Sequence, residues 1–275
     1  MVVEKICLKD VFPILGENNA NPTVECYLPY NMTEMNRQNQ KRPCMVVCPG
    51  GGYAFCSQRE AEPIALNLLP MGFNVFVLTY STFNEAYYPT QLLEVAATFE
   101  LIRQNEDKWN CDIEKIGIMG FSAGGHLAAH YSNSFDCPDI REKFKESIRP
   151  FASVLCYPVI SSDGEVAHKG SFENLLGYFP DADNEKYSCD KLVNENTPQA
   201  FIWHTAEDTC VPVENSLLYA LALKKHKIPF ELHIYPHGWH GLSTADAQTC
   251  DDIGDMHKYV NKWLTSLKKW VEITF

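Results

Sequence analysis

The stretch from Lys115 to Leu127, KIGIMGFSAGGHL, constrains the fold of this chain more than any other. A short apolar run ends abruptly at the sequence Gly-Phe-Ser-Ala-Gly, and a segment of small, helix-compatible residues follows at once. This pattern predicts a strand, a sharp turn and a helix, with Ser122 at the apex of the turn. A serine held in this way projects its hydroxyl away from the backbone, an arrangement known as a nucleophile elbow.

Two glycines flank Ser122, one on each side at a distance of two residues. On so tight a turn, side chains at Gly120 and Gly124 would collide with the neighbouring helix and strand, and glycine also tolerates unusual backbone angles. The helix after Ser122 would direct its amide dipoles at the place where negative charge develops in a reaction. A small-residue turn of an ordinary α/β protein is the alternative interpretation of this stretch alone.

The chain has 275 residues, which suits one large α/β domain or two small ones and allows a sizeable core. Its net charge of −12 is spread along the sequence and argues against nucleic acid or an anionic membrane as a partner. No run of about eighteen apolar residues predicts a transmembrane helix.

The 11 cysteines are dispersed, and several, such as Cys44, Cys48 and Cys156, lie within apolar runs. These are expected to be buried free thiols, since no Cys-x-x-Cys pair and no Cys/His spacing resembles a zinc site. The N-terminus shows no basic lead followed by an apolar core, as a secretory signal would. Free thiols without a signal predict a location in the reducing cytoplasm.

Strands and helices are expected to alternate along most of the chain. Modest signals predict antiparallel edge strands at 5–8 and 23–27, and apolar runs predict buried strands at 43–48, 73–80, 115–120, 152–157, 200–204 and 230–235. Helices are expected at 57–71, 90–104, after Ser122, and at 213–225 and 255–270. This alternation predicts an α/β fold with a mostly parallel central sheet covered by helices on both faces.

Residues 161–198 interrupt this regularity. Gly, Asp, Asn, Ser and Pro are frequent there, with only a short helical signal at 172–176. A long irregular insertion in a compact domain is usually functional. We therefore predict a small cap over the site, within a single domain that covers residues 1–275.

Three glycines, Gly50 to Gly52, end the apolar run that begins at Pro43. A phosphate-binding loop would need a lysine and a Ser/Thr after its last glycine, and a dinucleotide fingerprint would need spaced glycines that open a helix. Neither pattern is present. The loop is expected to approach a ligand with its backbone, and the amides of Gly51, Gly52 and Ala123 would together form an oxyanion hole.

Acyl transfer by a serine needs a base that accepts the hydroxyl proton and an acid that orients the base. Asp208 fits the acid because it lies in the loop after the strand predicted at 200–204, although Glu207 beside it has the same chemistry. His240 fits the base because it directly follows the last predicted strand. His237 is its rival and is expected to support the loop backbone. The order serine, acid, histidine is the one that this type of elbow requires.

Four segments carry a resemblance to a known family: VCPGGGY at 47–53, GFSAGGHLA at 120–128, WHTAEDTCVPVENS at 203–216 and PHGWHGLS at 236–243. They resemble the acetyl esterase and acetyl xylan esterase branch of the α/β-hydrolase serine esterases, a group of carbohydrate esterases. The resemblance spans most of the chain from residue 43, and segments 170–177 and 196–198 of the predicted cap look like that branch too. Lipase-like members carry His-Gly-Gly-Gly where Pro49 begins this loop, so the resemblance points away from lipases.

The resemblance implies an α/β-hydrolase fold and a carboxylic ester hydrolase for short acyl esters, with acetyl first, of sugars or xylo-oligosaccharides. Ser122, His240 and Asp208 would form its catalytic triad and pass through an acyl-enzyme. No metal and no cofactor are expected. The expected partner is a small acylated sugar, with neither nucleic acid nor membrane, and a homo-oligomer is left open.

Other interpretations stay open. An arylformamidase-like amidase or a general short-chain carboxylesterase would share the fold and triad, and a non-catalytic binding module would keep the scaffold alone. Aromatic side chains could line an aryl pocket or stack on sugar rings. Tyr53 and Trp239 are the predicted pocket residues, and Phe55, Tyr87, Tyr88 and Phe172 are further candidates.

Overall fold

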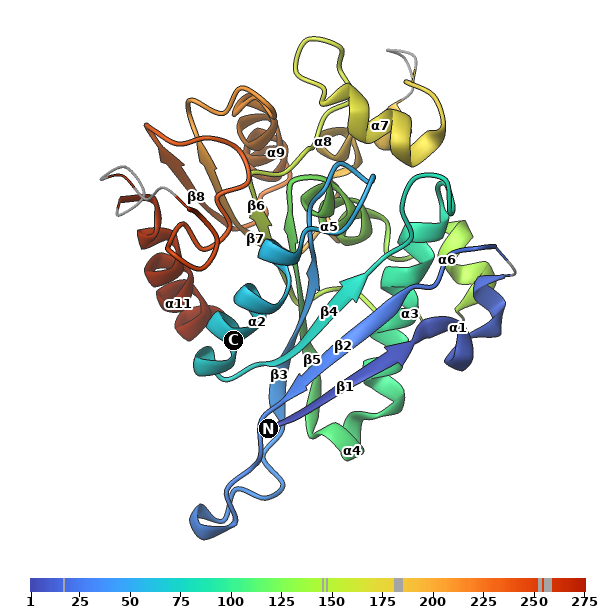
Figure 1. The fold of residues 1–275 in the computed structure, drawn as a ribbon, viewed down its shortest axis with the longest axis vertical. Coiled ribbons are helices and arrows are strands. Elements are labelled where there is room, and N and C mark those ends of the chain that lie inside the picture. The colour runs from blue at the N-terminus through green and yellow to red at the C-terminus, as the bar shows by residue number, and fades with distance from the viewer. Residues whose placement is uncertain (17, 145, 147, 181–184, 252–253, 255–258) are drawn as a thin grey trace.

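The computed structural model describes residues 1–275 except 17, 145, 147, 181–184, 252–253 and 255–258. Over the described residues the chain forms an eight-stranded sheet in the order β1-β2-β4-β3-β5-β6-β7-β8 (Figure 1). The strands are β1 (Val2–Cys7), β2 (Thr23–Leu28), β3 (Arg42–Cys48), β4 (Asn74–Thr79), β5 (Cys111–Phe121), β6 (Ala152–Cys156), β7 (Gln199–Thr205) and β8 (Phe230–Tyr235).

The sheet is parallel from β4 to β8 and antiparallel only at its first edge. β1 pairs with β2, and β2 with β4, in antiparallel fashion, whereas each later neighbour pair is parallel. The mostly parallel sheet and the antiparallel strands at its edge are therefore confirmed. The carboxyl ends of β3, β5, β7 and β8 consequently lie along one edge, where open α/β sheets bind their ligands.

Helices cover both faces of this sheet (Figure 1). They are α1 (Leu8–Val11), α2 (Glu62–Leu68), α3 (Thr90–Gln104), α4 (Glu106–Trp109), α5 (Ser122–Ser134), α6 (Pro138–Lys143), α7 (Lys169–Leu176), α8 (Cys189–Leu192), α9 (Glu214–Lys225) and α11 (Lys262–Thr274). α3, α5 and α9 bury side chains in one core, and α2 and α11 bury theirs in a second core across the sheet.

The central strand β3 shows why its sequence lacks polar alternation. Cys44, Val46 and Cys48 belong to the first core, while Met45 and Val47 belong to the second. Successive strand residues point to opposite faces, so a strand covered on both sides must be apolar at every position. The two cores thus account for the continuous apolar run that the sequence places before the glycine loop.

The helix expected at 57–71 is broken into three pieces. A 3₁₀ turn covers Gln58–Glu60, α2 follows, and a second 3₁₀ turn covers Leu69–Met71. Pro63 lies in the first turn of α2, where proline is tolerated, whereas Pro70 has no N–H group with which to continue the helix. The prolines, which apolar spacing ignores, explain the difference.

The C-terminal helix packs behind the site-bearing strands. The helix expected at 255–270 corresponds to α11, which reaches Thr274, and residues 255–258 lie outside the described residues. Trp263 of α11 is buried and stacks on Trp203 of β7 with ring centroids 5.0 Å apart. This contact fixes α11 against the strand that leads into Asp208.

The predicted cap segment, 161–198, contains α7 and α8, and residues 181–184 within it lie outside the described residues. α7 lies beyond the carboxyl ends of the strands (Figure 1). Asn174 of α7 donates a hydrogen bond from Nδ2 to the carbonyl oxygen of Gly52 at 2.8 Å. The segment therefore touches the glycine loop, and its role as a cap stays a prediction.

The turn at Ser122 is as tight as its glycines predict. Ser122 itself has φ +53°, in the left-handed region that non-glycine residues rarely adopt. A methyl group on Gly120 would lie 2.1 Å from the carbonyl oxygen of Gly124, and one on Gly124 would lie 2.1 Å from that of Cys48. Both positions leave no room for a side chain, because backbone from α5, β5 and β3 meets there.

Replacing Gly124 with alanine is expected to lower the free energy of unfolding by about 3 kcal/mol, because the methyl group forces apart two backbones in contact. Thermal unfolding followed by circular dichroism measures the loss. Gly164→Ala is the matched control, since a methyl group there meets nothing within 4 Å. Equal melting temperatures for the two variants would contradict this packing argument.

A buried carboxyl group holds the loop that follows β4. Glu94 of α3 is fully buried and accepts hydrogen bonds from the backbone N–H of Ser81, at 2.7 Å, and from the Ser81 hydroxyl. Burial raises the pKa of Glu94 to about 7, although both bonds from Ser81 oppose the rise. The folded protein thus holds a proton that the unfolded chain releases near pH 4.5.

Glu94 should make stability depend on pH in a defined direction. A raised pKa contributes stability that is full below about pH 4.5 and is lost as the pH rises through about 7. Wild type should therefore lose on the order of 3 kcal/mol of unfolding free energy relative to Glu94→Gln between about pH 4 and pH 8. Urea unfolding across this range tests it, with exposed Glu34→Gln as control, and parallel curves for wild type and Glu94→Gln would refute it.

Candidate active site

Ser122, His240 and Asp208 come together at the carboxyl edge of the sheet. His240 Nε2 lies 2.8 Å from Ser122 Oγ, and His240 Nδ1 lies 2.6 Å from Asp208 Oδ2. Ser122 begins α5 directly after β5, Asp208 lies in the loop after β7, and His240 lies in the loop after β8. The structure thus joins three residues that are far apart in the sequence into one hydrogen-bonded chain.

The two rival residues form a separate pair. His237 Nδ1 lies 2.8 Å from Glu207 Oε1, and both side chains are more than half exposed to solvent. Neither residue contacts Ser122. His240 contacts Ser122 directly, and Asp208 is linked to it through His240. This geometry therefore favours His240 over His237, and Asp208 over Glu207, as the residues linked to Ser122.

Asp208 is held by four donors. Its Oδ1 accepts the backbone N–H groups of Cys210 and Val211, both at 2.9 Å, and its Oδ2 accepts from His240 and from His204 Nε2 at 3.2 Å. Burial opposes the charged form, but the hydrogen bonds from His204, His240 and Val211 outweigh it and hold the pKa of Asp208 well below its ordinary value. The acid is therefore a fixed negative charge beside His240.

His204 is a site residue that the sequence analysis treats only as part of a strand. Its Nε2 has two acceptors, Asp208 Oδ2 and the carbonyl of Val211 at 3.0 Å, so this nitrogen carries the proton. Its Nδ1 lies 2.8 Å from the hydroxyl of Ser216. A histidine at the end of a buried strand must find partners. The sequence signal that would have identified His204 is therefore a histidine in a buried strand, four residues before a candidate acid.

The bond from Asp208 also decides which nitrogen of His240 can accept a proton. An ionised carboxylate only accepts, so Nδ1 of His240 donates to Asp208. Nε2 of the neutral ring is then an acceptor, and it faces the Ser122 hydroxyl. The arrangement is set up to remove a proton from Ser122 and to stabilise the imidazolium that results.

The glycine loop lies directly against the turn at Ser122. A methyl group on Gly50 would come within 3.0 Å of Ser122 Cβ, and Gly51 and Gly52 have φ values of +124° and +62°. In the part of the chain that the structure describes, the amides of Gly51, Gly52 and Ala123 donate to no protein acceptor. This is the condition that an oxyanion site requires, and the role of these amides stays a prediction.

Glu60 links the glycine loop to the loop that carries His240. The buried carboxylate accepts the N–H of Gly50 at 2.8 Å and the hydroxyl of Tyr157 at 2.6 Å, and that hydroxyl accepts the N–H of Ser243 at 2.9 Å. The Tyr157 ring packs edge-on against His240, with centroids 5.1 Å apart. Burial raises the pKa of Glu60. The sequence gives no sign of this network, because its members are distant along the chain.

The predicted pocket residues differ in their exposure to solvent. Tyr53 is 1% exposed, and its hydroxyl lies 2.8 Å from Nδ1 of buried His126, whose Nε2 donates to the carbonyl of Tyr187. The expectation that Tyr53 lines a substrate pocket is corrected, because its left-handed φ of +57° turns the side chain into the core. Trp239 is 47% exposed beside His240, and its pocket role stays a prediction. Phe172 is buried as well.

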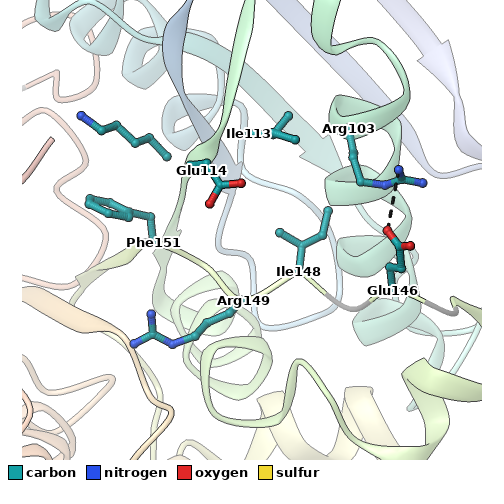
Figure 2. Close-up of a pocket in the computed structure, with 8 residues that line it drawn as sticks. Arg103, Ile113, Glu114, Glu146, Ile148, Arg149 and Phe151 are labelled. Carbon is teal, nitrogen blue, oxygen red and sulfur yellow. Dashed lines mark ion pairs between the residues drawn. The ribbon is translucent and has the colours of Figure 1, made fainter.

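A cavity of about 620 Å³ lies at the opposite end of β5 from Ser122 (Figure 2). Residues such as Glu114, Lys115 and Phe151 line it, with Arg103 and Arg149 (Figure 2). Each of its cations already has an oxygen partner: Arg103 pairs with Glu146, Lys115 with the Phe275 oxygen and Arg149 with two backbone carbonyls. This cavity plays no part in the site.

Two further features bear on the chemistry. Among the described residues, no group of three or more His, Cys, Asp or Glu side chains could hold a metal ion. Across that same part of the chain, no helix has the length and apolar character needed to span a membrane.

Comparisons with known proteins identify the family and support the fold. The sequence model of the BD-FAE family matches residues 30–223. The chain belongs to the BD-FAE family. A solved acetyl ester-xyloside bifunctional hydrolase from Caldicellulosiruptor lactoaceticus is 40% identical, with a TM-score of 0.83 over 98% of this chain and 96% of that one. The resemblance to acetyl esterases and the α/β-hydrolase fold are confirmed.

Two curated relatives of this BD-FAE family member are longer proteins. Endo-1,4-beta-xylanase B from Butyrivibrio fibrisolvens is 40% identical over 80% of this chain and 35% of its own length. Acetylxylan esterase from Xylanibacter ruminicola is 32% identical over 95% of this chain and 50% of its own length. The chain thus spans half or less of the length of these relatives.

Asp208→Asn is expected to lower the free energy of unfolding by about 2 kcal/mol at neutral pH, because a neutral amide replaces a buried carboxylate held by four donors. A lowered pKa contributes stability that is present above about pH 4 and is lost as the pH falls towards the folded pKa. The difference from wild type should therefore shrink in acid. Urea unfolding as a function of pH measures it, with solvent-exposed Asp107→Asn as control. A difference that does not change with pH would contradict the assignment to charge.

Proposed function

We propose that this chain is a serine carboxylesterase that removes short acyl groups, with acetyl as the preferred group, from sugars or xylo-oligosaccharides. The observation that carries the proposal is the chain of hydrogen bonds from Ser122 through His240 to Asp208, with distances of 2.8 and 2.6 Å. Ser122 stands on a strained turn beside loop amides that donate to no acceptor among the described residues, where its hydroxyl can reach an ester carbonyl.

In the first step Ser122 Oγ attacks the carbonyl carbon of the ester. His240 Nε2 takes the hydroxyl proton, the carbonyl π bond opens, and the negative charge moves onto the carbonyl oxygen. Asp208 stabilises the imidazolium. When the carbonyl re-forms, the bond to the sugar oxygen breaks, and His240 returns its proton to that oxygen. The products are a free sugar hydroxyl and acyl-Ser122.

The second step repeats the first with water as the nucleophile. His240 takes a proton from water, the hydroxide oxygen bonds to the acyl carbon, and Ser122 leaves with the proton that His240 returns. The carboxylic acid is released and the enzyme is restored. Both tetrahedral intermediates carry an oxyanion, for which the amides of Gly51, Gly52 and Ala123 would supply donors. Each such donor contributes about 3 kcal/mol in enzymes of this type.

The substrate class rests on the relatives. One solved relative is described as an acetyl ester-xyloside hydrolase, and one curated relative as an acetylxylan esterase. The chain spans nearly the whole of that solved structure. A short acyl group on a xylose-based sugar is therefore the substrate that the family supports best for this chain.

Ser122→Ala is expected to lower kcat for p-nitrophenyl acetate by more than about 10⁴-fold, because no nucleophile remains. Ser134→Ala, at the other end of α5, is the matched control, and circular dichroism verifies that both variants fold. Retained activity in Ser122→Ala would contradict the proposal.

The acyl preference is tested on wild type with p-nitrophenyl acetate, butyrate and octanoate, together with acetylated xylo-oligosaccharides. We expect kcat/KM to be highest for acetate and acetic acid to be released from the oligosaccharides. A preference for octanoate would overturn the sugar-ester assignment. Faster hydrolysis of N-formylkynurenine would favour the arylformamidase-like alternative.

A further inference from the structure

His168, in the predicted cap segment, lies over the glycine loop. It immediately precedes α7, and a methyl group on Gly52 would lie 3.9 Å from its Cε1 and 3.9 Å from Oγ of Ser171. The imidazole and the hydroxyl therefore stand next to one of the two loop amides assigned to the oxyanion. No mechanism step described above uses either side chain.

Hydrogen bonds hold His168 in this place. Its Nδ1 lies 2.7 Å from the hydroxyl of Ser171, and its carbonyl accepts the N–H of Ser171 at 3.0 Å. Ser171 is buried, and Asn174, on the same helix, donates to the carbonyl of Gly52 at 2.8 Å. The ring is thus fixed relative to the glycine loop, while part of it stays open to solvent.

The charges of His240 and Asp208 also act on His168. Burial lowers its pKa, the nearby His240 lowers it further, and Asp208 opposes the shift. The lowered pKa keeps the imidazole neutral at neutral pH. When the Ser171 hydroxyl donates to Nδ1, the single ring proton is on Nε2.

The position of this N–H group limits what it can bind. The carbonyl oxygen of the ester is assigned to the loop amides, and a short acyl chain offers no acceptor. A donor that faced only an apolar group would lose a hydrogen bond to water without replacement. The alcohol part of a sugar ester, by contrast, carries several hydroxyl and ring oxygens.

We propose that His168 Nε2 donates a hydrogen bond to an oxygen of the sugar that leaves, so that His168 and Ser171 recognise the alcohol part of the substrate. This inference rests on the proposed function and deepens it. His168 selects polyol leaving groups over apolar ones, and Ser171 positions its ring.

The test compares two acetyl esters whose alcohols have rings of similar size. One is mono-acetylated methyl xyloside, which keeps free hydroxyls, and the other is cyclohexyl acetate. In His168→Ala, the ratio of kcat/KM for the xyloside to that for cyclohexyl acetate should fall about tenfold, as expected for one lost hydrogen bond. His168→Gln, which retains a side-chain N–H donor, should recover part of the ratio. His226→Ala, at the end of α9, should leave it unchanged.

The outcomes separate this inference from the function on which it rests. A wild type that hydrolyses cyclohexyl acetate but not the acetylated xyloside overturns the proposed substrate class and the inference with it. A wild type that hydrolyses the xyloside, with an unchanged ratio in His168→Ala, overturns the inference alone. Equal losses on both esters in His168→Ala and His168→Gln would also overturn it, because the residue would then act only on the structure.

Discussion

A contact between two backbones sets the geometry of this site. Gly124 of α5 approaches the carbonyl of Cys48, the last residue of β3, so closely that no side chain fits between them. The helix that begins with Ser122 and the strand that delivers the glycine loop are therefore held at a fixed separation. The placement of the loop amides relative to the Ser122 hydroxyl depends on that separation, and the oxyanion role proposed for these amides requires donors that are in place before charge develops. The two cores of the sheet, one on each face, keep both elements from moving apart.

Buried carboxyl groups do the remaining alignment, and their surroundings shift their pKa values in opposite directions. Asp208 is surrounded by four donors and is held ionised, as a partner of an imidazolium must be. Glu60 and Glu94 are buried with fewer donors, and burial raises the pKa of both. Each of them joins two separate segments. Glu60 bridges the glycine loop and Tyr157, and Glu94 ties α3 to the loop after β4. A buried carboxyl group thus serves either as a fixed charge or as a structural acceptor, according to its donors.

The sequence predicts the fold and the three residues of the hydrogen-bonded chain because each has a local signature. Ser122 lies between glycines, Asp208 and His240 each follow an apolar strand, and their order is fixed by the scaffold. Glu60 and His168 have no such signature. The contact between Glu60 and Tyr157 joins residues 97 positions apart, and only the folded sheet brings them together. Tyr53 is predicted to line a pocket because an aromatic side chain can face an aryl group or stack on a sugar ring. Its backbone angle, which no pattern of side chains reveals, turns it inward instead.

The left-handed backbone at Ser122 limits which residue could replace the proposed nucleophile. Threonine offers the same hydroxyl chemistry, but a residue branched at Cβ is strongly disfavoured at a φ of +53°. Cysteine is unbranched and meets no such barrier. The turn therefore acts as a filter on chemical identity, since it rejects the nearest oxygen substitute and accepts a sulfur one. A turn of this shape therefore disfavours the change from serine to threonine, whereas the change from alcohol to thiol leaves its backbone unchanged.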